Sequence, residues 1–233
     1  MAEWRNTSGK TLRDYPRPSL AVDVAVLTVV DARLHVLVVE SPHDGLALPG
    51  TFVHPDERTH DAAERALRTK AGVEDVQMHQ LAIFDEPTRD YRGWVMSMAY
   101  GTALARDRLP GNAVLVGVTG GEPDQSLAWD HARMVRLAVA DLRARYADEV
   151  DPDNLIGHQF TVLELRHLYE AVYENPLPKD TFRRQVSDGL DSTGKVSSSA
   201  GGRPAELYRR RAGTYLPRSA AGVFEGHRID VTR

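Results

Sequence analysis

The sequence predicts a mixed α/β domain, in which helices sandwich a mixed sheet, followed by a small winged helix-turn-helix domain. Three observations carry this prediction. β-branched runs alternate with helical periodicity up to about residue 150. A turn-rich Asp151–Asn154 segment then interrupts the pattern. Beyond it come two short helical segments split by prolines, a Gly/Ser-rich stretch and a short strand, in the order of a winged helix. A length of 233 residues suits two such domains.

The first domain begins with a predicted hairpin. Residues 19–30 and 34–40 are rich in valine and bracket a turn at 31–33. A helix over 56–72 presents a stripe of small apolar side chains and stops at Gly72. The remaining predicted elements are strands over 80–84, 93–105 and 113–119 and a helix over 130–146.

The second domain opens on a capping box. In the run Thr161-Val-Leu-Glu164, the threonine hydroxyl and the glutamate carboxylate each satisfy a free amide of the first helical turn. Prolines at 176 and 178 end that helix. A second helix over about 180–190, a flexible loop over 191–202 and a strand over 205–209 follow. The predicted organisation is an N-terminal arm (1–18), an α/β domain (19–150), a winged-helix domain (151–213) and a C-terminal tail (214–233).

The bulk composition excludes several classes of protein. The chain has no cysteine, which rules out disulfides and a thiolate nucleophile, and no apolar run is long enough for a membrane helix. Its N-terminus lacks a signal core, so we expect a cytoplasmic location and no membrane partner. Residues 1–157 carry 17 basic and 24 acidic side chains, whereas residues 179–211 carry eight basic and four acidic ones. Any nucleic-acid contact is therefore expected near the C-terminus, although charge alone also fits a solvated basic face.

Residues 48–73 resemble the Nudix box, the metal-binding motif of Nudix hydrolases. The scaffold positions of the motif match in register at Glu57, Arg65, Leu67, Gly72 and Val73. Its metal-binding carboxylates do not, because their positions hold Ala66, Thr69 and Lys70, and its first glycine is Thr51. A methyl group, a hydroxyl and a cation do not hold Mg²⁺ or Mn²⁺. Asp61 and Glu64 lie one turn earlier and do not share the required face. We expect no catalytic residue, no metal and no required cofactor.

Loss of the metal leaves ligand binding possible, because the resemblance places most nucleotide contacts outside the box. The run 84–93 sets two arginines beside a tyrosine in a loop between strands. Guanidinium groups suit phosphate oxygens, and an aromatic face suits adenine. A charged surface loop with an internal Arg–Asp pair explains the same residues equally well. The candidate ligand-binding residues are Arg65, Lys70, Phe84, Arg89, Tyr91 and Arg92.

Taken together, both halves resemble the NrtR family of Nudix-related transcriptional regulators of NAD metabolism. The resemblance covers nearly all of residues 19–211. Besides the altered box, it rests on the segments FDEPTRDYRGWVMSMAY (84–100), WDHARM (129–134), FTVLELRHLYEAVYENPLPKDTFRR (160–184) and GRPAELYR (202–209). It implies a homodimeric repressor of NAD biosynthesis or salvage genes that binds double-stranded operator DNA. It also implies that ADP-ribose binds the Nudix domain and releases the DNA.

The main candidate DNA contacts lie on the second helix of the winged-helix domain, which we call the reader, and at the point where its wing returns. Arg183 and Arg184 are also explained by a solvent-exposed helix face that makes no contact with DNA. Two other functions stay open at this point: an active ADP-ribose pyrophosphatase with a rearranged metal site, and a nucleotide-binding adaptor with no DNA role. The candidate DNA-binding residues are Thr161, Lys179, Thr181, Arg183, Arg184, Arg203 and Pro204.

Overall fold

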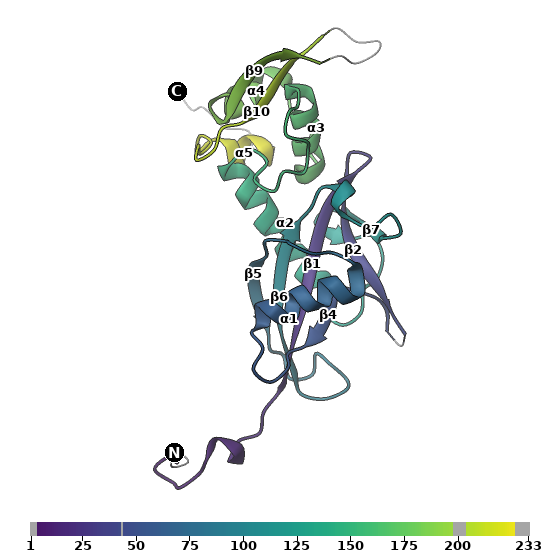
Figure 1. The fold of residues 1–233 in the computed structure, drawn as a ribbon, viewed down its shortest axis with the longest axis vertical. Helices are drawn as coiled ribbons and strands as arrows, with labels where there is room; N and C mark the ends of the chain where they lie inside the picture. Colours follow the sequence, from purple (N-terminus) through teal and green to yellow (C-terminus); the bar gives the residue numbers. More distant parts are fainter. Residues whose placement is uncertain (1–3, 43, 198–203, 227–233) are drawn as a thin grey trace.

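A computed structural model describes residues 4–42, 44–197 and 204–226, and its larger domain is built on an eight-stranded sheet (Figure 1). The strand order is β5-β6-β1-β2-β7-β8, with β3 paired to β2 and β4 to β1. Only β1 and β6 run parallel, so the sheet is mixed as predicted. The strands are β1 (Ser19–Val30), β2 (Arg33–Ser41), β3 (Gly45–Ala47), β4 (Gly50–Phe52), β5 (His79–Phe84), β6 (Val95–Ala103), β7 (Val114–Thr119) and β8 (Glu122–Pro123).

The first hairpin and the box helix confirm the sequence prediction. Asp31 and Ala32 have φ of 49° and 57°, as a tight turn between paired strands requires. Helix α1 (Thr59–Ala66) continues as a single π-helical stretch, η2 (Leu67–Ala71). Gly72, at φ 62°, then ends it in the left-handed conformation that glycine adopts without steric cost.

Helices cover both faces of the sheet. Ala62, Ala63 and Leu67 pack from α1 and η2 onto Val22 and Val24 of β1, and all five side chains are fully buried. Helix α2 (His131–Asp148) covers the opposite face through Met134, Val135, Val139 and Leu142. The predicted sandwich of helices around a mixed sheet is therefore present. A short 3-10 turn, η3 (Arg106–Arg108), precedes β7.

The smaller domain is a winged helix. Helix α3 (Val162–Tyr173) begins at the predicted capping box, in which Glu164 and Thr161 bond each other's backbone amides. Helix α4 (Lys179–Val186) follows, and the 3-10 turn η4 (Ser187–Gly189) leads into the antiparallel pair β9 (Leu190–Val196) and β10 (Glu206–Arg210).

The sequence prediction was wrong about the start of the wing. Residues 191–196 were expected to form a flexible loop, but they form most of β9. This strand is polar and mostly exposed, so it lacks the alternation of apolar side chains by which a strand is recognised. Hydrogen bonding to β10 holds these residues in an extended strand, which their composition does not predict.

The segment named as a C-terminal tail contributes to the reader's core. Helix α5 (Ala220–Phe224) buries Ala220 and Phe224 completely. The Phe224 ring lies 4.9 Å from the ring of Tyr169 and 5.9 Å from that of Phe182, measured between centroids. Because Tyr169 and Phe182 come from α3 and α4, α5 closes the aromatic core of the helix-turn-helix.

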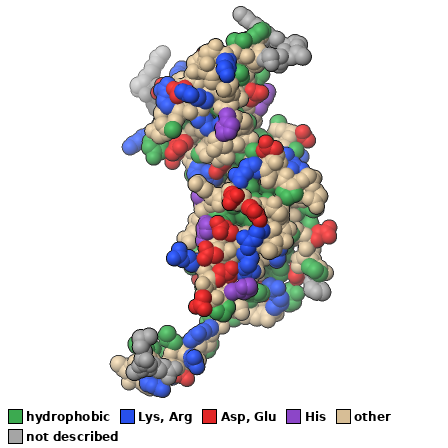
Figure 2. Space-filling model, viewed as in Figure 1, with side chains coloured by type: hydrophobic (Ala, Val, Ile, Leu, Met, Phe, Trp, Pro, Cys, Tyr) green, Lys and Arg blue, Asp and Glu red, His purple; other side chains and the backbone are tan. Residues whose placement is uncertain are grey.

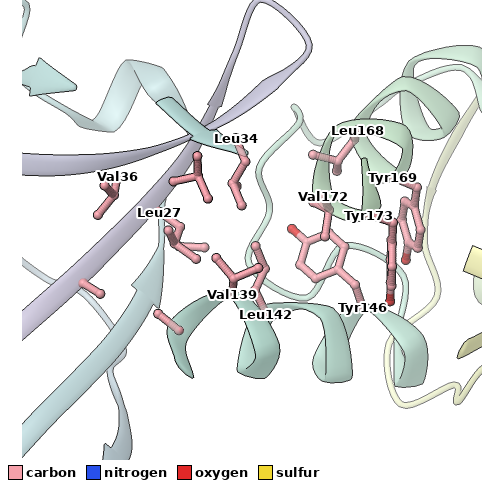
Figure 3. Close-up of a cluster of buried hydrophobic side chains, with 14 of the residues drawn as sticks. Leu27, Leu34, Val36, Val139, Leu142, Tyr146, Leu168, Tyr169, Val172 and Tyr173 are labelled. Atoms are coloured by element: carbon pink, nitrogen blue, oxygen red, sulfur yellow. The ribbon is translucent and has the colours of Figure 1, made fainter. Parts of the chain in front are cut away.

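Helix α2 belongs to the hydrophobic core of both domains. Figure 3 shows Val139 and Leu142 directed toward Leu27 and Leu34 of the sheet, and Tyr146, one turn further along, beside Tyr169 and Tyr173 of α3. One continuous cluster of buried side chains thus runs from the sheet into the winged helix.

The segment between the domains is held by Asp151, whose side chain is fully buried. Its carboxylate accepts hydrogen bonds from the Tyr146 hydroxyl at 2.7 Å, from the Leu155 amide at 2.8 Å and from the guanidinium of Arg210 at the end of β10. The Arg210 guanidinium also lies over the Phe160 ring. Through Asp151, these contacts connect Tyr146 at the end of α2 to Arg210 of the wing strand β10.

Two further features complete the fold. Residues 4–18 form an arm that extends away from the sheet and contains one 3-10 turn, η1 (Leu12–Asp14) (Figure 1). Among the described residues, no helix is long and apolar enough to span a membrane.

Candidate ligand cleft and DNA-binding surface

A cleft of about 910 Å³ opens on the α/β domain. Its walls come from β1, β2 and β4, from η2, from the loop between β5 and β6, and from the residues just before α2. This volume lies within the range that small-molecule sites occupy. The basic side chains that line it are Arg68, Lys70, Arg89 and Arg92.

The positions that would carry the metal ligands of a Nudix box hold no carboxylate. Ala66 is fully buried. The Thr69 hydroxyl donates to the Arg65 carbonyl oxygen at 2.7 Å, one turn back along the helix. Lys70 is exposed at the cleft, and the described part of the chain gives its ammonium group no hydrogen bond or ion pair. The cleft therefore presents a free cation where a metal-dependent enzyme presents carboxylates.

The matching scaffold residues of the box hold the loop before α1. Arg65 makes two hydrogen bonds of 2.8 Å to Glu57, one of 2.9 Å to the Phe52 carbonyl oxygen and one of 3.1 Å to the Thr51 hydroxyl. The bonds from Arg65, with one from the His54 amide, lower the pKa of Glu57 from 4.5 to about 2. Thr51, which replaces the first glycine of the box, is thus part of a structural clamp. The Glu57 carboxylate is therefore engaged in holding the loop before α1.

Arg89 reaches the floor of the cleft and is already paired there. Its guanidinium makes a two-point contact with Asp130, the residue that precedes α2, and one of these hydrogen bonds is 2.8 Å long. The side chain of Arg89 is only 5% exposed. Burial disfavours the charged form, but the bonds to Asp130 more than offset this cost and raise the pKa of Arg89. A cation is therefore fixed at the floor of the cleft, against the first turn of α2.

Arg92 is held between aromatic rings. It donates to Asp90 at 2.7 Å and 2.9 Å, and its guanidinium carbon lies 4.9 Å from the centroid of the Trp129 ring and 5.5 Å from that of Phe52. Trp129 has φ of 50°, an uncommon conformation for a residue with a bulky side chain. Its buried Nε1 has no hydrogen-bond partner among the described residues. The cleft thus contains an aromatic and cationic stack with a free donor beside it.

A buried contact between His131 and Asp23 supports this wall of the cleft. The Leu48 amide donates to Nδ1 of His131 at 2.9 Å, which leaves the ring proton on Nε2, 3.4 Å from Asp23. Asp23 also accepts from the Ser97 hydroxyl at 2.6 Å. Burial opposes ionisation of Asp23, but His131, Ser97 and Arg89 together lower its pKa. A side chain at Gly50 would collide with this carboxylate, because an added Cβ would lie 1.9 Å from Oδ1.

Three of the candidate ligand-binding residues lie outside the cleft. Phe84 is buried, with the Arg133 guanidinium 5.2 Å from its ring. Arg65 is held by the clamp described above, and Tyr91 is 73% exposed on the surface. Arg89, Arg92 and Lys70 line the cleft together. Sequence reasoning missed Phe52 and Trp129, although the WDHARM segment that carried the resemblance contains Trp129.

Four of the candidate DNA-binding residues lie on α4 of the winged helix. Lys179, Arg183 and Arg184 are exposed on α4, and Thr181 is half-buried beside them. Arg184 has no side-chain partner in the described part of the chain, whereas the guanidinium of Arg183 lies near Glu206 and Tyr208 of the wing. By the order of its elements, α4 corresponds to the helix that helix-turn-helix proteins place in the major groove.

The remaining candidates are placed differently. Thr161 is 9% exposed, and its hydroxyl is occupied in the capping box, so it does not offer a group to DNA. Pro204 is exposed just before β10, and Arg203 lies outside the described residues. Lys195 and Arg209 are exposed on the two wing strands and were not among the candidates. They were overlooked because residues 191–196 were taken for a loop and 205–209 only for a return strand.

The comparisons with known proteins agree with this two-part architecture. The NUDIX domain family matches residues 19–151, and the NrtR DNA-binding winged helix domain matches residues 152–210. The chain is 30% identical over 208 residues to the ADPR responsive transcriptional repressor NtrR of Acinetobacter baylyi, an alignment covering 84% of this chain and 83% of that protein.

Solved structures also agree with this two-part architecture. The NrtR of Shewanella oneidensis, crystallised with a 27mer DNA, is 27% identical, with a TM-score of 0.69 over 88% of this chain and 96% of that chain. A MutT/nudix family protein from Enterococcus faecalis shares the fold at 21% identity and a TM-score of 0.66, over 87% of this chain and 90% of that one.

Fold and site together define a regulator class, in which a Nudix domain with an altered metal box is joined to a winged-helix DNA-binding domain. Both domain matches and the curated relative lead to one family. The chain belongs to the NrtR family of transcriptional regulators.

Proposed function

We propose that the chain is a homodimeric repressor of NAD biosynthesis or salvage genes, whose Nudix domain binds ADP-ribose without hydrolysing it. It acts on operator DNA in the cytoplasm, and the bound nucleotide releases that DNA. The observation that carries the proposal is the cleft itself, which joins four cationic side chains to an aromatic stack and has Lys70 where the metal ligands of a hydrolase lie. The name of the Acinetobacter relative supports ADP-ribose as the effector.

The chemistry of the cleft fits a nucleoside diphosphate sugar. Guanidinium and ammonium groups donate charge-assisted hydrogen bonds to phosphate oxygens. Phe52 and Trp129 offer apolar faces to a base or a ribose. Phosphate oxygens that reach Arg89 compete with Asp130, so binding is linked to the first turn of α2. A ligand shifts DNA affinity only if it favours the arrangement that does not bind DNA.

Replacing Lys70 with alanine tests this assignment of the cleft. Lys70 makes no contact that the fold requires, so its loss removes one phosphate partner without disturbing the domain. We expect ADP-ribose binding, measured by calorimetry, to weaken about tenfold, or about 1.4 kcal/mol. A promoter fragment from upstream of the chain's own gene should then need correspondingly more ADP-ribose for release.

Arg136→Ala provides the matched control. Arg136 is an exposed arginine paired with Glu122 at 2.7 Å, and neither residue lines the cleft. This variant should bind ADP-ribose as the parent protein does. Equal affinity in the parent and Lys70→Ala proteins would contradict the proposed site, and a fragment that stays bound at saturating ADP-ribose would contradict release.

An active pyrophosphatase would need a replacement metal site at the cleft. Among the described residues, one exposed cluster brings metal-binding groups together, His60, Asp61 and Glu64 of α1, and none of the three lines the cleft. We therefore expect no AMP above background when the protein is incubated with ADP-ribose and Mg²⁺ or Mn²⁺. Steady AMP production, followed by chromatography, would contradict the proposal that the domain binds its nucleotide without cleaving it.

A further inference from the structure

One face of the sheet is left partly uncovered beside the N-terminal arm. Leu20 pairs with Met96, and Val22 with Met98, across the parallel strands β1 and β6, and Ile83 of β5 pairs with Met98. Residues in register share a face, so these side chains lie on the side of the sheet that α1 covers. Helix α1 packs over Val22 and the residues beyond it, and it leaves the beginning of β1 bare.

The uncovered surface is apolar. Leu20 is 39% exposed, Ile83 53% and Trp94, just before β6, 47%, while Met96 and Met98 are half-buried. We call these five side chains the open sheet face. Isolated exposed apolar residues are normal, but a contiguous set on a sheet indicates an interaction surface.

The arm that precedes β1 also exposes apolar groups, and its structure is local. Trp4, Leu12 and Tyr15 are 58%, 62% and 44% exposed. Asn6 accepts from the Ser8 and Lys10 amides and donates to the Tyr15 hydroxyl, and Thr11 and Asp14 form a capping box. The arm leaves the domain at Ser19, beside the open sheet face, and points away from it (Figure 1).

The charges of the two surfaces are complementary. Residues 4–18 carry four basic side chains and one acidic one. The exposed Asp61 and Glu64 of α1 lie beside the open sheet face, because the neighbouring His60 packs its ring 6.2 Å from that of Tyr100, two residues beyond Met98 on β6. Figure 2 shows acidic side chains on this face of the domain, with basic ones among them, and basic side chains on the arm.

We propose that the arm of one subunit lies across the open sheet face of a second copy of this chain. Trp4, Leu12 and Tyr15 would cover the apolar strands, and the basic side chains of the arm would meet the acidic residues of α1. This inference rests on the homodimer of the proposed function and names the surface that forms it. In a symmetric dimer the arms exchange, so each subunit covers the other's sheet.

Chemical cross-linking between chains tests this placement, because the chain contains no cysteine. Leu12→Cys protein is mixed with isotopically labelled Ile83→Cys protein and treated with a short bismaleimide. We expect a linked heterodimer joining positions 12 and 83, identified by mass spectrometry, at several times the yield of a Leu12→Cys and Tyr215→Cys mixture. Tyr215 is 72% exposed on the other domain and serves as the matched site.

Sedimentation of Leu12→Asp protein provides a second measurement. A buried leucine side chain contributes enough that its loss should raise the dimer dissociation constant about tenfold or more. Val196→Asp, an equally exposed apolar position on the wing, should leave that constant unchanged.

The outcomes separate this inference from the proposed function. A stable dimer with equal yields for the two cysteine mixtures would overturn the arm placement and leave the homodimer standing. A Leu12→Cys, Ile83→Cys double variant that cross-links within one chain would show the arm folding back on its own sheet, and would also overturn it. A parent protein that sediments as a monomer at every concentration would overturn the homodimer itself.

Discussion

Replacing Arg183 and Arg184 together with alanine should weaken operator binding about thirtyfold or more. Both side chains are exposed on α4, the helix placed to enter the major groove. Each arginine contact to a base edge or phosphate contributes about 1–3 kcal/mol, so two contribute at least about 2 kcal/mol. Fluorescence anisotropy with the promoter fragment measures the change. If both contact phosphates, the dependence of affinity on salt should also fall by about two counterions.

Two comparisons make this result specific to the DNA surface. Arg136→Ala removes an exposed arginine from the other domain and should leave DNA affinity unchanged. The double variant should bind ADP-ribose normally, because neither residue lines the cleft. Retained DNA binding in the double variant would refute α4 as the reading helix.

Replacing Phe224 with alanine should lower the free energy of unfolding by about 3–5 kcal/mol. The ring is fully buried and touches aromatic side chains of both reader helices, Tyr169 and Phe182. Truncation leaves a cavity that those rings fill only in part. Urea unfolding measures the loss, and we expect DNA binding to fall with the folded population.

Tyr215→Ala is the matched control for this prediction. It removes an aromatic side chain from the same C-terminal segment, but one that is 72% exposed. Its effect should stay within about 0.5 kcal/mol, as is usual for surface substitutions. Equal stability of the Phe224→Ala and parent proteins would show that α5 contributes nothing to the reader's core.

The sequence predicted elements wherever a local pattern is strong. The valine-rich hairpin, the helix of the box and the Thr161 capping box each depend on residues within a few positions of one another, and the structure contains all three. Strand β9 and helix α5 depend on partners far along the chain. Their own residues carry no strong periodicity, so only the folded context reveals them.

The candidate site could be predicted only in part, for a related reason. The sequence locates a loop with arginines, but it does not say which way each side chain of the loop turns. Arg89 and Arg92 turn into the cleft, whereas Tyr91 between them turns to solvent. Trp129 reaches the cleft from the residues before α2, and no spacing within the box predicts that approach.

The shared helix α2 bears on how such a regulator can be modified. Its first half completes the core of the sheet, and its last turn completes the core of the reader. A cut between residues 150 and 151 would therefore separate the Tyr146 ring from α3 and the Asp151 carboxylate from the Tyr146 hydroxyl. The segment that must be transferred to move DNA binding to another protein is therefore larger than the winged helix alone. A chimera that grafts this reader onto another Nudix domain needs the second half of α2 transferred with it.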